Sequence, residues 1–211
     1  MLYGKVVLMN YIVMDMEYNS NFDFAKGEKA PANPRLPAEI IQIGAIKLDS
    51  ELNAMGEFGT TVCPFVYKGL NPFVAKITGL SGNVLRNSPS FKAAYNGFLR
   101  FAAKEPAIMC FWGKDDIKEL FRNILFHELD HRPISCSYIN VQRLAAIYLG
   151  QEKSRMPSLA TAAEALGIPL ARPFHDAAND AYYTAEVFKI ICKGQKIDIM
   201  QDNYELESNA L

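Results

Sequence analysis

The sequence predicts an α/β domain whose mixed sheet carries helices on both faces, and three observations lead to this fold class. Three strand-like segments separated by polar turns come first along the chain, which is typical of an antiparallel meander. The remaining chain alternates short apolar runs with segments whose apolar residues recur every three or four positions. Strands that alternate with helices form parallel pairs, so a meander joined to them gives a mixed sheet.

Size and composition indicate one globular unit. The chain has 211 residues, of which 50% are apolar and 21% charged, so it can bury a full core without disulfides or structural metals. No repeat of fixed period divides it. We therefore expect a single domain over residues 1–211, with its core at about 9–193 and an acidic, frayed tail at 194–211. Residues before Met9 are interpreted as a leader or an alternative start.

Charge and cysteine usage exclude several classes of protein. The 22 basic and 23 acidic residues nearly balance, whereas proteins that coat long nucleic acids are strongly basic, so any contact with nucleic acid should be local. The four cysteines lack the paired spacing of a zinc site, which fits the reducing cytoplasm. The apolar run at residues 6–14 is too short to cross a membrane, so no membrane partner is expected.

The N-terminal part contains the three segments of the predicted meander. The first strand, at residues 6–14, precedes a polar stretch at 18–38 that carries three prolines, so we expect a long surface loop there. The second and third strands are expected at 39–49 and 57–63, joined by a turn at 50–56.

Helices and strands alternate in the middle of the chain. Helical spacing begins at residues 72–103, where Ser81 and Ser90 are the expected N-caps. An apolar strand at 107–112 then precedes a helix at 117–128.

The C-terminal part continues the alternation. A strand at 136–141 leads to helices at 142–149 and 158–166, the latter capped by Ser158. The last helix is expected at 177–192.

Two acidic residues stand at the end of the first strand. Asp15 and Glu17 are two positions apart, so their side chains project from one face, about 7 Å apart along the strand. The end of this strand lies at the carboxyl edge of the sheet, where ligand sites of α/β proteins form. The pair can therefore hold metal ions, although such a pair alone is also compatible with solvated surface.

The segment FWGKDD supplies a third candidate. Asp116 follows a strand that ends at Trp112 and a turn at Gly113. An aspartate at this place also complements a helix dipole, so the other interpretation is that Asp115 or Asp116 caps the next helix.

The segment FHDAANDA supplies a fourth carboxylate and a histidine. His175 precedes the last helix, Asp176 is its expected N-cap, and Asp180 falls on its first turns. The alanines around Asp180 are small enough to let this helix approach the sheet closely. A histidine beside a loop aspartate is also compatible with an incidental surface pair.

The order and spacing of these residues resemble the DEDDh 3′-to-5′ exonucleases, a family with a ribonuclease H-like fold. The residues that carry the resemblance are Asp15, Glu17, Asp116, His175 and Asp180. The segments EIIQIGAIKLD, ITGLS and SPSF are also similar to segments of the family, so the resemblance covers about residues 11–188.

One branch of the family is the most similar. The long loop after Glu17 and the Trp112-Gly113 pair resemble the RNA-processing branch typified by histone-mRNA exonucleases and a bacterial sporulation-inhibitor group. The sequence departs from the family at Met16, where Phe, Leu or Ile is common, and at Tyr18-Asn19, which replace a Thr-rich continuation. Neither departure removes a metal ligand, but both put the substrate contacts in doubt.

The resemblance implies a metal-dependent exonuclease that hydrolyses phosphodiester bonds from the 3′ end of single-stranded nucleic acid and releases nucleoside 5′-monophosphates, with RNA favoured over DNA. Two ions about 4 Å apart stabilise both the attacking and the leaving oxygen of such a reaction. Carboxylate oxygens favour Mg²⁺ or Mn²⁺ over zinc. The implied ligands of the two ions are Asp15, Glu17, Asp116 and Asp180.

The resemblance also implies how protons and the 3′ end are handled. His175 is the implied general base, a task that suits an imidazole. Aromatic residues at 18–24 are candidates for stacking on the terminal base.

Two other classes of function are compatible with parts of the sequence. The segment HELDH at residues 127–131 fits HExxH, which binds zinc on a helix of metallopeptidases. Pro133 ends any helix two residues later, and only the distant His175 remains as a third histidine, so a zinc peptidase is not favoured. A non-catalytic module that binds nucleic acid or protein is the main alternative, because fold alone does not establish activity.

Overall fold

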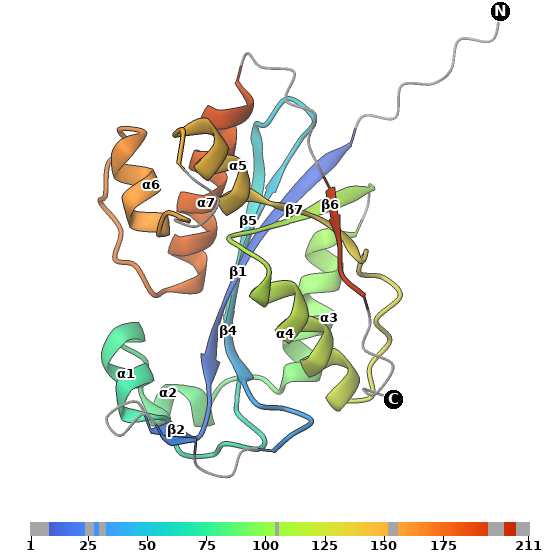
Figure 1. Cartoon of the computed structure of the whole chain (residues 1–211). Helices are drawn as coiled ribbons and strands as arrows, with labels where there is room; N and C mark the ends of the chain where they lie inside the picture. The colour runs from blue at the N-terminus through green and yellow to red at the C-terminus, as the bar shows by residue number, and fades with distance from the viewer. Residues whose placement is uncertain are drawn as a thin grey trace, which may run out of the picture.

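A six-stranded mixed sheet runs through the middle of the molecule, in the order β5-β4-β1-β6-β7-β8 (Figure 1). The computed structural model describes residues 9–23, 28–29, 33–103, 106–151, 156–193 and 201–205. The strands of the sheet are β1 (Asn10–Asn19), β4 (Glu39–Leu48), β5 (Ala54–Thr61), β6 (Ala107–Phe111), β7 (Ser137–Asn140) and β8 (Gln201–Asn203). The predicted α/β class with a mixed sheet is confirmed.

The central strand β1 joins the two halves of the sheet. It pairs antiparallel with β4, and β4 pairs antiparallel with β5, which is the predicted meander. On its other side β1 is parallel to β6, with Met14 opposite Phe111, and β6 is parallel to β7. The strand β6 therefore ends level with Asp15, and the turn after it opens beside the acidic end of β1.

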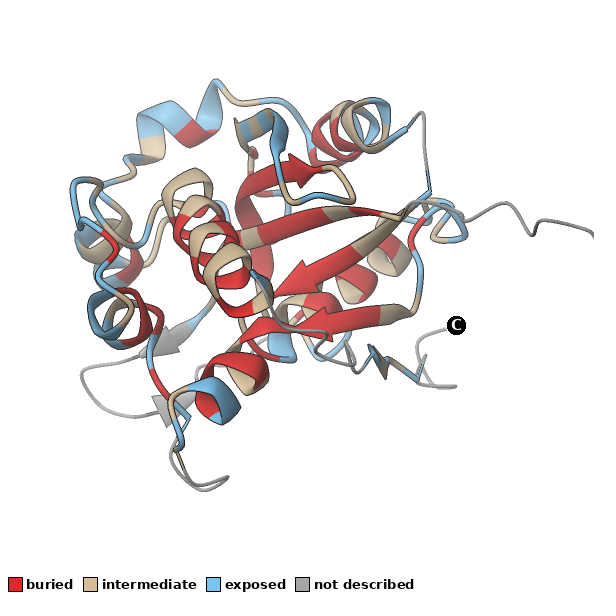
Figure 2. Ribbon diagram, turned by 90° about the horizontal axis from the view of Figure 1, so that it is seen from above, coloured by how far each residue is buried: buried red, intermediate tan, exposed pale blue. Residues whose placement is uncertain are grey.

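Helices cover both faces of the sheet, and buried residues concentrate in the sheet and on the helix sides that face it (Figure 2). The helices α3 and α4 pack with Ile12, Met14 and Met16 of β1, whereas α5, α6 and α7 pack with Val13. Because side chains alternate along a strand, the odd-numbered acidic residues of β1 point to the α7 face. The helices are α1 (Pro72–Thr78), α2 (Gly82–Arg86), α3 (Phe91–Ala102), α4 (Asp115–Phe126), α5 (Val141–Tyr148), α6 (Leu159–Ala165) and α7 (Ala177–Cys192).

The helix starts agree with the capping residues that the sequence predicts. The hydroxyls of Ser81, Ser90 and Ser158 accept backbone N–H groups in the first turns of α2, α3 and α6. Asp176 does the same for α7, whose bounds are those predicted. No helix of the described residues has the length and apolar character needed to cross a membrane.

The stretch at 18–38 is more ordered than the predicted loop. The strand β1 continues through Asn19, and β2 (Phe22–Asp23) pairs antiparallel with β3 (Glu28–Lys29). All three prolines of the stretch follow β3 in sequence, so the segment before them has no residue that blocks strand pairing.

The turn between β4 and β5 is shorter than predicted. The Asp49 carboxylate accepts the backbone N–H groups of Glu51 and Asn53, each at 2.8 Å. These bonds close the turn within a few residues, so β5 begins at Ala54 and not near Glu57.

The prediction of a frayed tail is wrong for residues 201–205. Here β8 pairs antiparallel with β7, and Asp202 forms an ion pair with Arg143 of α5 at 2.7 Å. Tyr204 stacks on Phe121 of α4 with ring centroids 5.2 Å apart. The acidic residue and the aromatic ring therefore anchor a short strand, which composition alone did not reveal. Residues before Met9 lie outside the described part of the chain.

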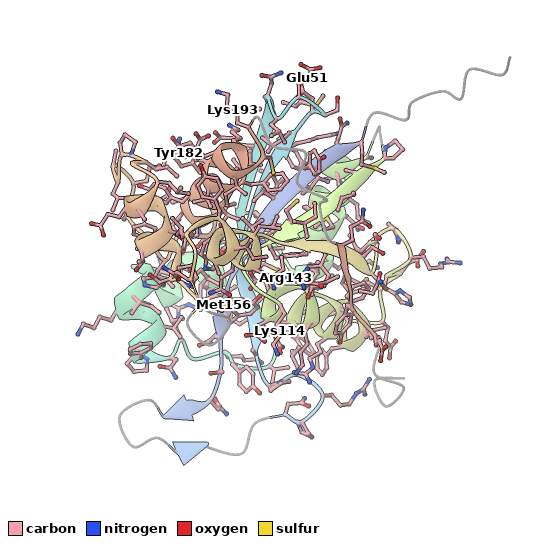
Figure 3. The ribbon with its side chains drawn as sticks, turned by 45° about the horizontal axis from the view of Figure 1, so that its top comes forward. Glu51, Lys114, Arg143, Met156, Tyr182 and Lys193 are labelled. Atoms are coloured by element: carbon pink, nitrogen blue, oxygen red, sulfur yellow. The ribbon has the colours of Figure 1, made fainter. Side chains whose placement is uncertain are left out.

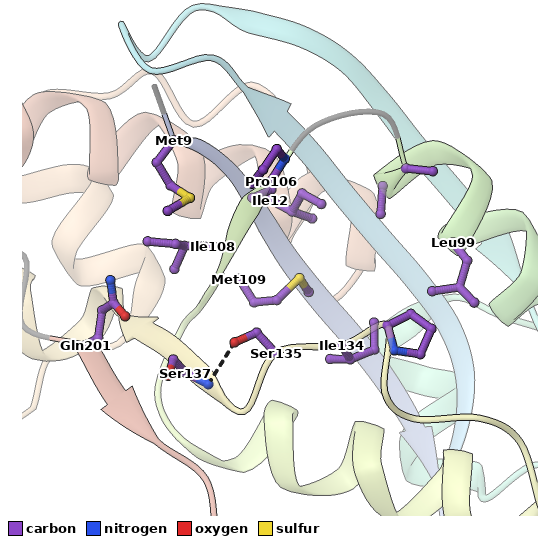
Figure 4. Close-up of a pocket in the computed structure, with 14 residues that line it drawn as sticks. Met9, Ile12, Leu99, Pro106, Ile108, Met109, Ile134, Ser135, Ser137 and Gln201 are labelled. Carbon is purple, nitrogen blue, oxygen red and sulfur yellow. Dashed lines mark hydrogen bonds between the residues drawn. The ribbon is translucent and has the colours of Figure 1, made fainter. Parts of the chain in front are cut away.

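A cavity of about 680 Å³ lies at the amino ends of β1 and β6, away from the acidic end of β1 (Figure 4). Its described lining carries no charged side chain, in contrast to the acidic end of β1. Its polar side chains are Ser135, Ser137 and Gln201, and Ser135 Oγ accepts the backbone N–H of Ser137 at 3.1 Å.

Candidate active site

Asp15 and Glu17 are held by the central strand. They lie opposite Gly44 and Gln42 of β4, and the register shifts immediately after Glu17, between Glu17 and Tyr18. Both carboxylates point to the face that α7 covers, as alternation requires. The rigid centre of the sheet therefore fixes the position of two acids predicted from the sequence.

The start of α7 lies directly on β4 because Gly44 has no side chain. A Cβ on Gly44 would lie 2.1 Å from the carbonyl oxygen of Ala177 and 2.3 Å from the backbone nitrogen of Ala178. Gln42 adds two hydrogen bonds: its Nε2 donates to Asp176 Oδ2 at 2.8 Å, and its Oε1 accepts the N–H of Ala177 at 3.2 Å. The first turn of α7 is thus fastened to the strand next to β1.

Asp180 and His175 reach the site from this first turn and the loop before it. Asp180 is 8% exposed, and its Oδ2 accepts the backbone N–H of His175 at 3.1 Å. Its other oxygen, Oδ1, is buried and has no hydrogen-bond partner among the described residues. His175 is exposed and has a φ of 63°, a left-handed conformation that is uncommon outside glycine.

Asp116 comes from the first turn of α4. Lys114 occupies the N-cap position and makes no side-chain capping bond, so neither Asp115 nor Asp116 caps the helix. The hydroxyl of Tyr18 donates a hydrogen bond to Asp116 Oδ1 at 2.7 Å. In Figure 3, Lys114 marks the start of α4, and Glu51, which follows β4, marks the opposite end of the sheet. Asp116 therefore lies at the end of the sheet away from the turn between β4 and β5.

The structure brings these residues to one end of the sheet. Ligand atoms of Glu17, His175 and Asp180 all lie within 4.8 Å of one another, which is close enough for a shared metal ion. Asp15 and Asp116 lie outside that tight group, but their charges act on each other and on Asp180. Every residue predicted for the site is therefore found in one cluster.

Burial and mutual repulsion shape the charge of this cluster. Burial, with the nearby charges of Asp180, Asp116 and Asp176, raises the pKa of Glu17 to about 8. Burial raises the pKa of Asp116 to about 7, although the hydrogen bond from Tyr18 opposes the rise.

The other two acids are shifted in the same direction. Burial raises the pKa of Asp180 to about 6, against the backbone hydrogen bond from His175. Burial, followed by the charge of Asp116, raises the pKa of Asp15 well above its usual range. Several carboxylates that destabilise one another in this way are stabilised by a cation placed between them.

The donor atoms of the cluster fit a hard divalent cation. Four carboxylates and one imidazole converge, without a cysteine among them, and oxygen ligands of this kind suit Mg²⁺ or Mn²⁺. The buried Oδ1 of Asp180 has no partner within the described protein, and a bound cation would supply one.

The chain matches the model of one protein family. The model of the exonuclease family RNase_T matches residues 13–188, a segment that contains all five of these residues. The chain belongs to this exonuclease family. The membership confirms the exonuclease predicted from the sequence. No curated protein gives a significant match.

Solved structures share the fold of this exonuclease at low sequence identity. The nuclease domain of 3′hExo, a DEDDh family member bound to rAMP, superposes with a TM-score of 0.78 and 16% identity, over 96% of this chain and 100% of that one. A 3′-exonuclease that recognises the 3′ end of a histone mRNA stem-loop superposes with a TM-score of 0.72 and 16% identity, over 88% of this chain and 82% of that one.

A third match is to part of a larger protein. E. coli exonuclease I in complex with single-stranded DNA gives a TM-score of 0.65 and 18% identity, over 89% of this chain and 41% of that one. The exonuclease described here spans less than half the length of that protein. At these identities the three likenesses establish the fold.

The HELDH segment of this exonuclease does not form a peptidase site. The helix α4 ends at Phe126, and Glu128 has a φ of 54°, so the two histidines do not share a helix face. The ring of His127 stacks on Phe91 at 5.0 Å, and that of His131 lies edge-on to Phe121 at 6.0 Å. Both histidines thus pack against aromatic residues.

The aromatic residues proposed for base stacking are only partly described. Tyr18 belongs to β1, and its ring packs against the core under α3 and α4, so it is not a loop residue. The side chains of Phe22 and Phe24 lie outside the described part of the chain.

Three contributors to the site were missed from the sequence. Gln42 and Gly44 fasten α7, and Tyr18 holds Asp116. A glycine inside a buried strand does signal a close backbone approach, so Gly44 was detectable. No sequence signal identifies the partners of Gln42 and Tyr18, which lie 134 and 98 residues away.

Proposed function

We propose that this chain is a metal-dependent exonuclease that removes nucleotides from the 3′ end of single-stranded nucleic acid, with RNA preferred over DNA. The observation that carries the proposal is the convergence of four partly or fully buried carboxylates and one exposed histidine at the carboxyl end of β1 and β6. Membership of the exonuclease family supports the reaction class.

Asp15, Glu17, Asp116 and Asp180 would hold two divalent ions, Mg²⁺ or Mn²⁺. When bound, such ions stabilise the charge that develops on the attacking and leaving oxygens of a phosphodiester. The protein keeps these carboxylates in place before any ion binds: β1 fixes two of them, and the first turns of α4 and α7 fix the others.

His175 acts as the general base of the proposed reaction. Its imidazole is exposed, and a ligand atom of its ring lies within 4.8 Å of carboxylate oxygens of Glu17 and Asp180. From that place the ring accepts a proton from the attacking water, while the hydrogen bond from its backbone N–H keeps the loop against Asp180.

The proposed substrate class rests on charge and on the neighbouring structures. Proteins that share this fold recognise a histone mRNA stem-loop or bind rAMP or single-stranded DNA. The net charge of −1 suits a protein that grips only the end of a strand. The preference for RNA follows the sequence resemblance to the RNA-processing branch.

The test uses 5′-labelled single-stranded RNA and DNA of one sequence, with Mg²⁺, Mn²⁺ or a chelator. Asp15→Asn removes one ligand charge with little change in volume. His175→Asn removes the imidazole, and asparagine tolerates the left-handed backbone that His175 adopts. A ladder that shortens from the 3′ end, requires metal and is lost in both variants supports the proposal, and the faster substrate identifies the preferred sugar.

One outcome would favour the non-catalytic alternative. If the folded protein binds the labelled strand but leaves it intact with either metal, the chain is a binding module on an exonuclease fold, and the proposed reaction is rejected.

A further inference from the structure

Tyr18 reaches Asp116 from the face of β1 opposite to Asp15 and Glu17. The register shift after Glu17 pairs Tyr18 with Ile40, and its ring packs against the core under α3 and α4. Asp15 and Glu17 point to the α7 face, on the other side of β1. Asp116, at the start of α4, therefore stands between Tyr18 on one side and the acids of β1 on the other.

The contact between Tyr18 and Asp116 is a directed hydrogen bond. The phenolic hydroxyl donates to Asp116 Oδ1 at 2.7 Å, a short distance typical of a bond to a carboxylate. Of the described residues, Tyr18 alone donates a hydrogen bond to this side chain. The neighbours Asp115 and Glu119 carry the same charge as Asp116 and repel it. Without the hydroxyl, this carboxylate would have no hydrogen-bond donor among the described residues.

We propose that Tyr18 is a positioning residue, which holds Oδ1 of Asp116 so that Oδ2 is presented to a divalent cation. A carboxylate oriented by a hydrogen bond to one oxygen binds a cation through the other without first losing rotational freedom. The inference rests on the proposed metal site but not on the proposed cleavage.

Tyr18→Phe tests the role, because it removes one oxygen and keeps the ring that packs in the core. We expect the dissociation constant of Mn²⁺, measured by titration calorimetry on the metal-free protein, to rise about tenfold. Tyr95→Phe is the matched control: its hydroxyl donates to the backbone carbonyl of Asp130 at 2.9 Å, remote from the carboxylates. That variant should bind Mn²⁺ like the unmodified protein.

A double-mutant cycle separates positioning from general packing. If Tyr18 acts through Asp116, Tyr18→Phe has no further effect on Mn²⁺ affinity once Asp116→Asn is present. Thermal unfolding of each variant shows that the fold is retained.

The proposal would be overturned if Tyr18→Phe bound Mn²⁺ as tightly as the unmodified protein. It would also be overturned if Tyr18→Phe lowered the Mn²⁺ affinity by the same factor with and without Asp116→Asn. Cleavage assays are scored separately. A protein that binds Mn²⁺ in the expected pattern but cleaves no strand retains the positioning role and loses the proposed exonuclease activity.

Discussion

Gly44 lies against the backbone of Ala177, and a methyl group on Gly44 would lie 2.1 Å from the Ala177 carbonyl oxygen. No side chain intervenes between β4 and the first turn of α7 at this point. Since Asp180 stands one turn further along the helix, this contact sets the depth at which Asp180 faces Asp15 and Glu17. The geometry of the cluster therefore depends on the absence of a side chain at Gly44 of the neighbouring strand β4.

Gly44→Ala should destabilise the protein and abolish cleavage. Overpacking of this kind costs about 1–3 kcal/mol, and here the clashing atoms are backbone, so α7 must move as a body. Urea unfolding measures the first effect and the 3′-end assay the second. Gly59→Ala is the control, because Gly59 pairs with Gly44 across the sheet and its Cβ would meet only the Ala178 Cβ, at 3.5 Å. Equal losses in the two variants would contradict the argument.

The sequence predicted the sheet and the reacting groups because both follow local patterns. Asp15 and Glu17 follow an apolar run within β1, and Asp176 and Asp180 occupy predictable positions at a helix start. The bond between Tyr18 and Asp116 joins residues 98 positions apart, and no local pattern encodes it.

The last strand escaped prediction for a related reason. The segment that forms β8 is three residues long and polar, and it is held by an ion pair to Arg143 and by the stacking of Tyr204. Contacts of this kind depend on the assembled sheet. Composition, which suggested fraying, contains no information about them.

Without metal, the protein should be more stable at pH 5.5 than at pH 8. The pKa values of Glu17, Asp116 and Asp180 are raised to about 8, 7 and 6 by burial, against values near 4 in an unfolded chain. A raised pKa means that the folded state binds protons more tightly, so the free energy of unfolding increases as the pH falls through this range. Thermal unfolding in the presence of a chelator measures the trend.

Glu17→Gln isolates the contribution of the carboxylate cluster to the pH dependence of the free energy of unfolding. The lowered pKa of the half-buried His127 acts in the opposite direction, but it is common to both proteins. The variant should be more stable than the unmodified protein at pH 8 without metal and should show a weaker pH dependence. Mn²⁺ should stabilise the unmodified protein at pH 8 and do so less in the variant. An identical pH dependence in the two proteins would argue against a repelling cluster.

His175→Asn should separate proton transfer from metal binding. If the imidazole is the general base, kcat falls about 10²- to 10⁴-fold while the affinity for Mn²⁺ changes little. If His175 is instead a metal ligand, which its distance from Glu17 and Asp180 also allows, the Mn²⁺ affinity falls with kcat. Single-turnover kinetics at saturating Mn²⁺, together with calorimetric titration, distinguish the two roles.

Asn19→Ala should loosen the segment that leads into α1. The buried Asn19 amide donates to the carbonyls of Tyr67 and Gly69 at 2.9 and 3.0 Å and accepts the N–H of Asn71 at 3.0 Å. Its removal leaves buried backbone groups unsatisfied, at a cost of about 1–3 kcal/mol. Hydrogen exchange should accelerate at residues 67–73 and not in α7. Asn96→Ala, at an exposed position, is the control, and equal exchange in both variants would contradict this role of Asn19.

His127→Phe should leave metal binding and activity unchanged and should not lower stability. The ring of His127 lies among Phe65, Phe91 and Phe126, and its Nε2 is buried without a hydrogen-bond partner among the described residues. Replacing a buried polar atom that has no partner by an apolar one of similar shape is neutral or stabilising. Metal analysis and urea unfolding test both statements. Stoichiometric zinc that survives purification and disappears in this variant would instead revive the HExxH interpretation.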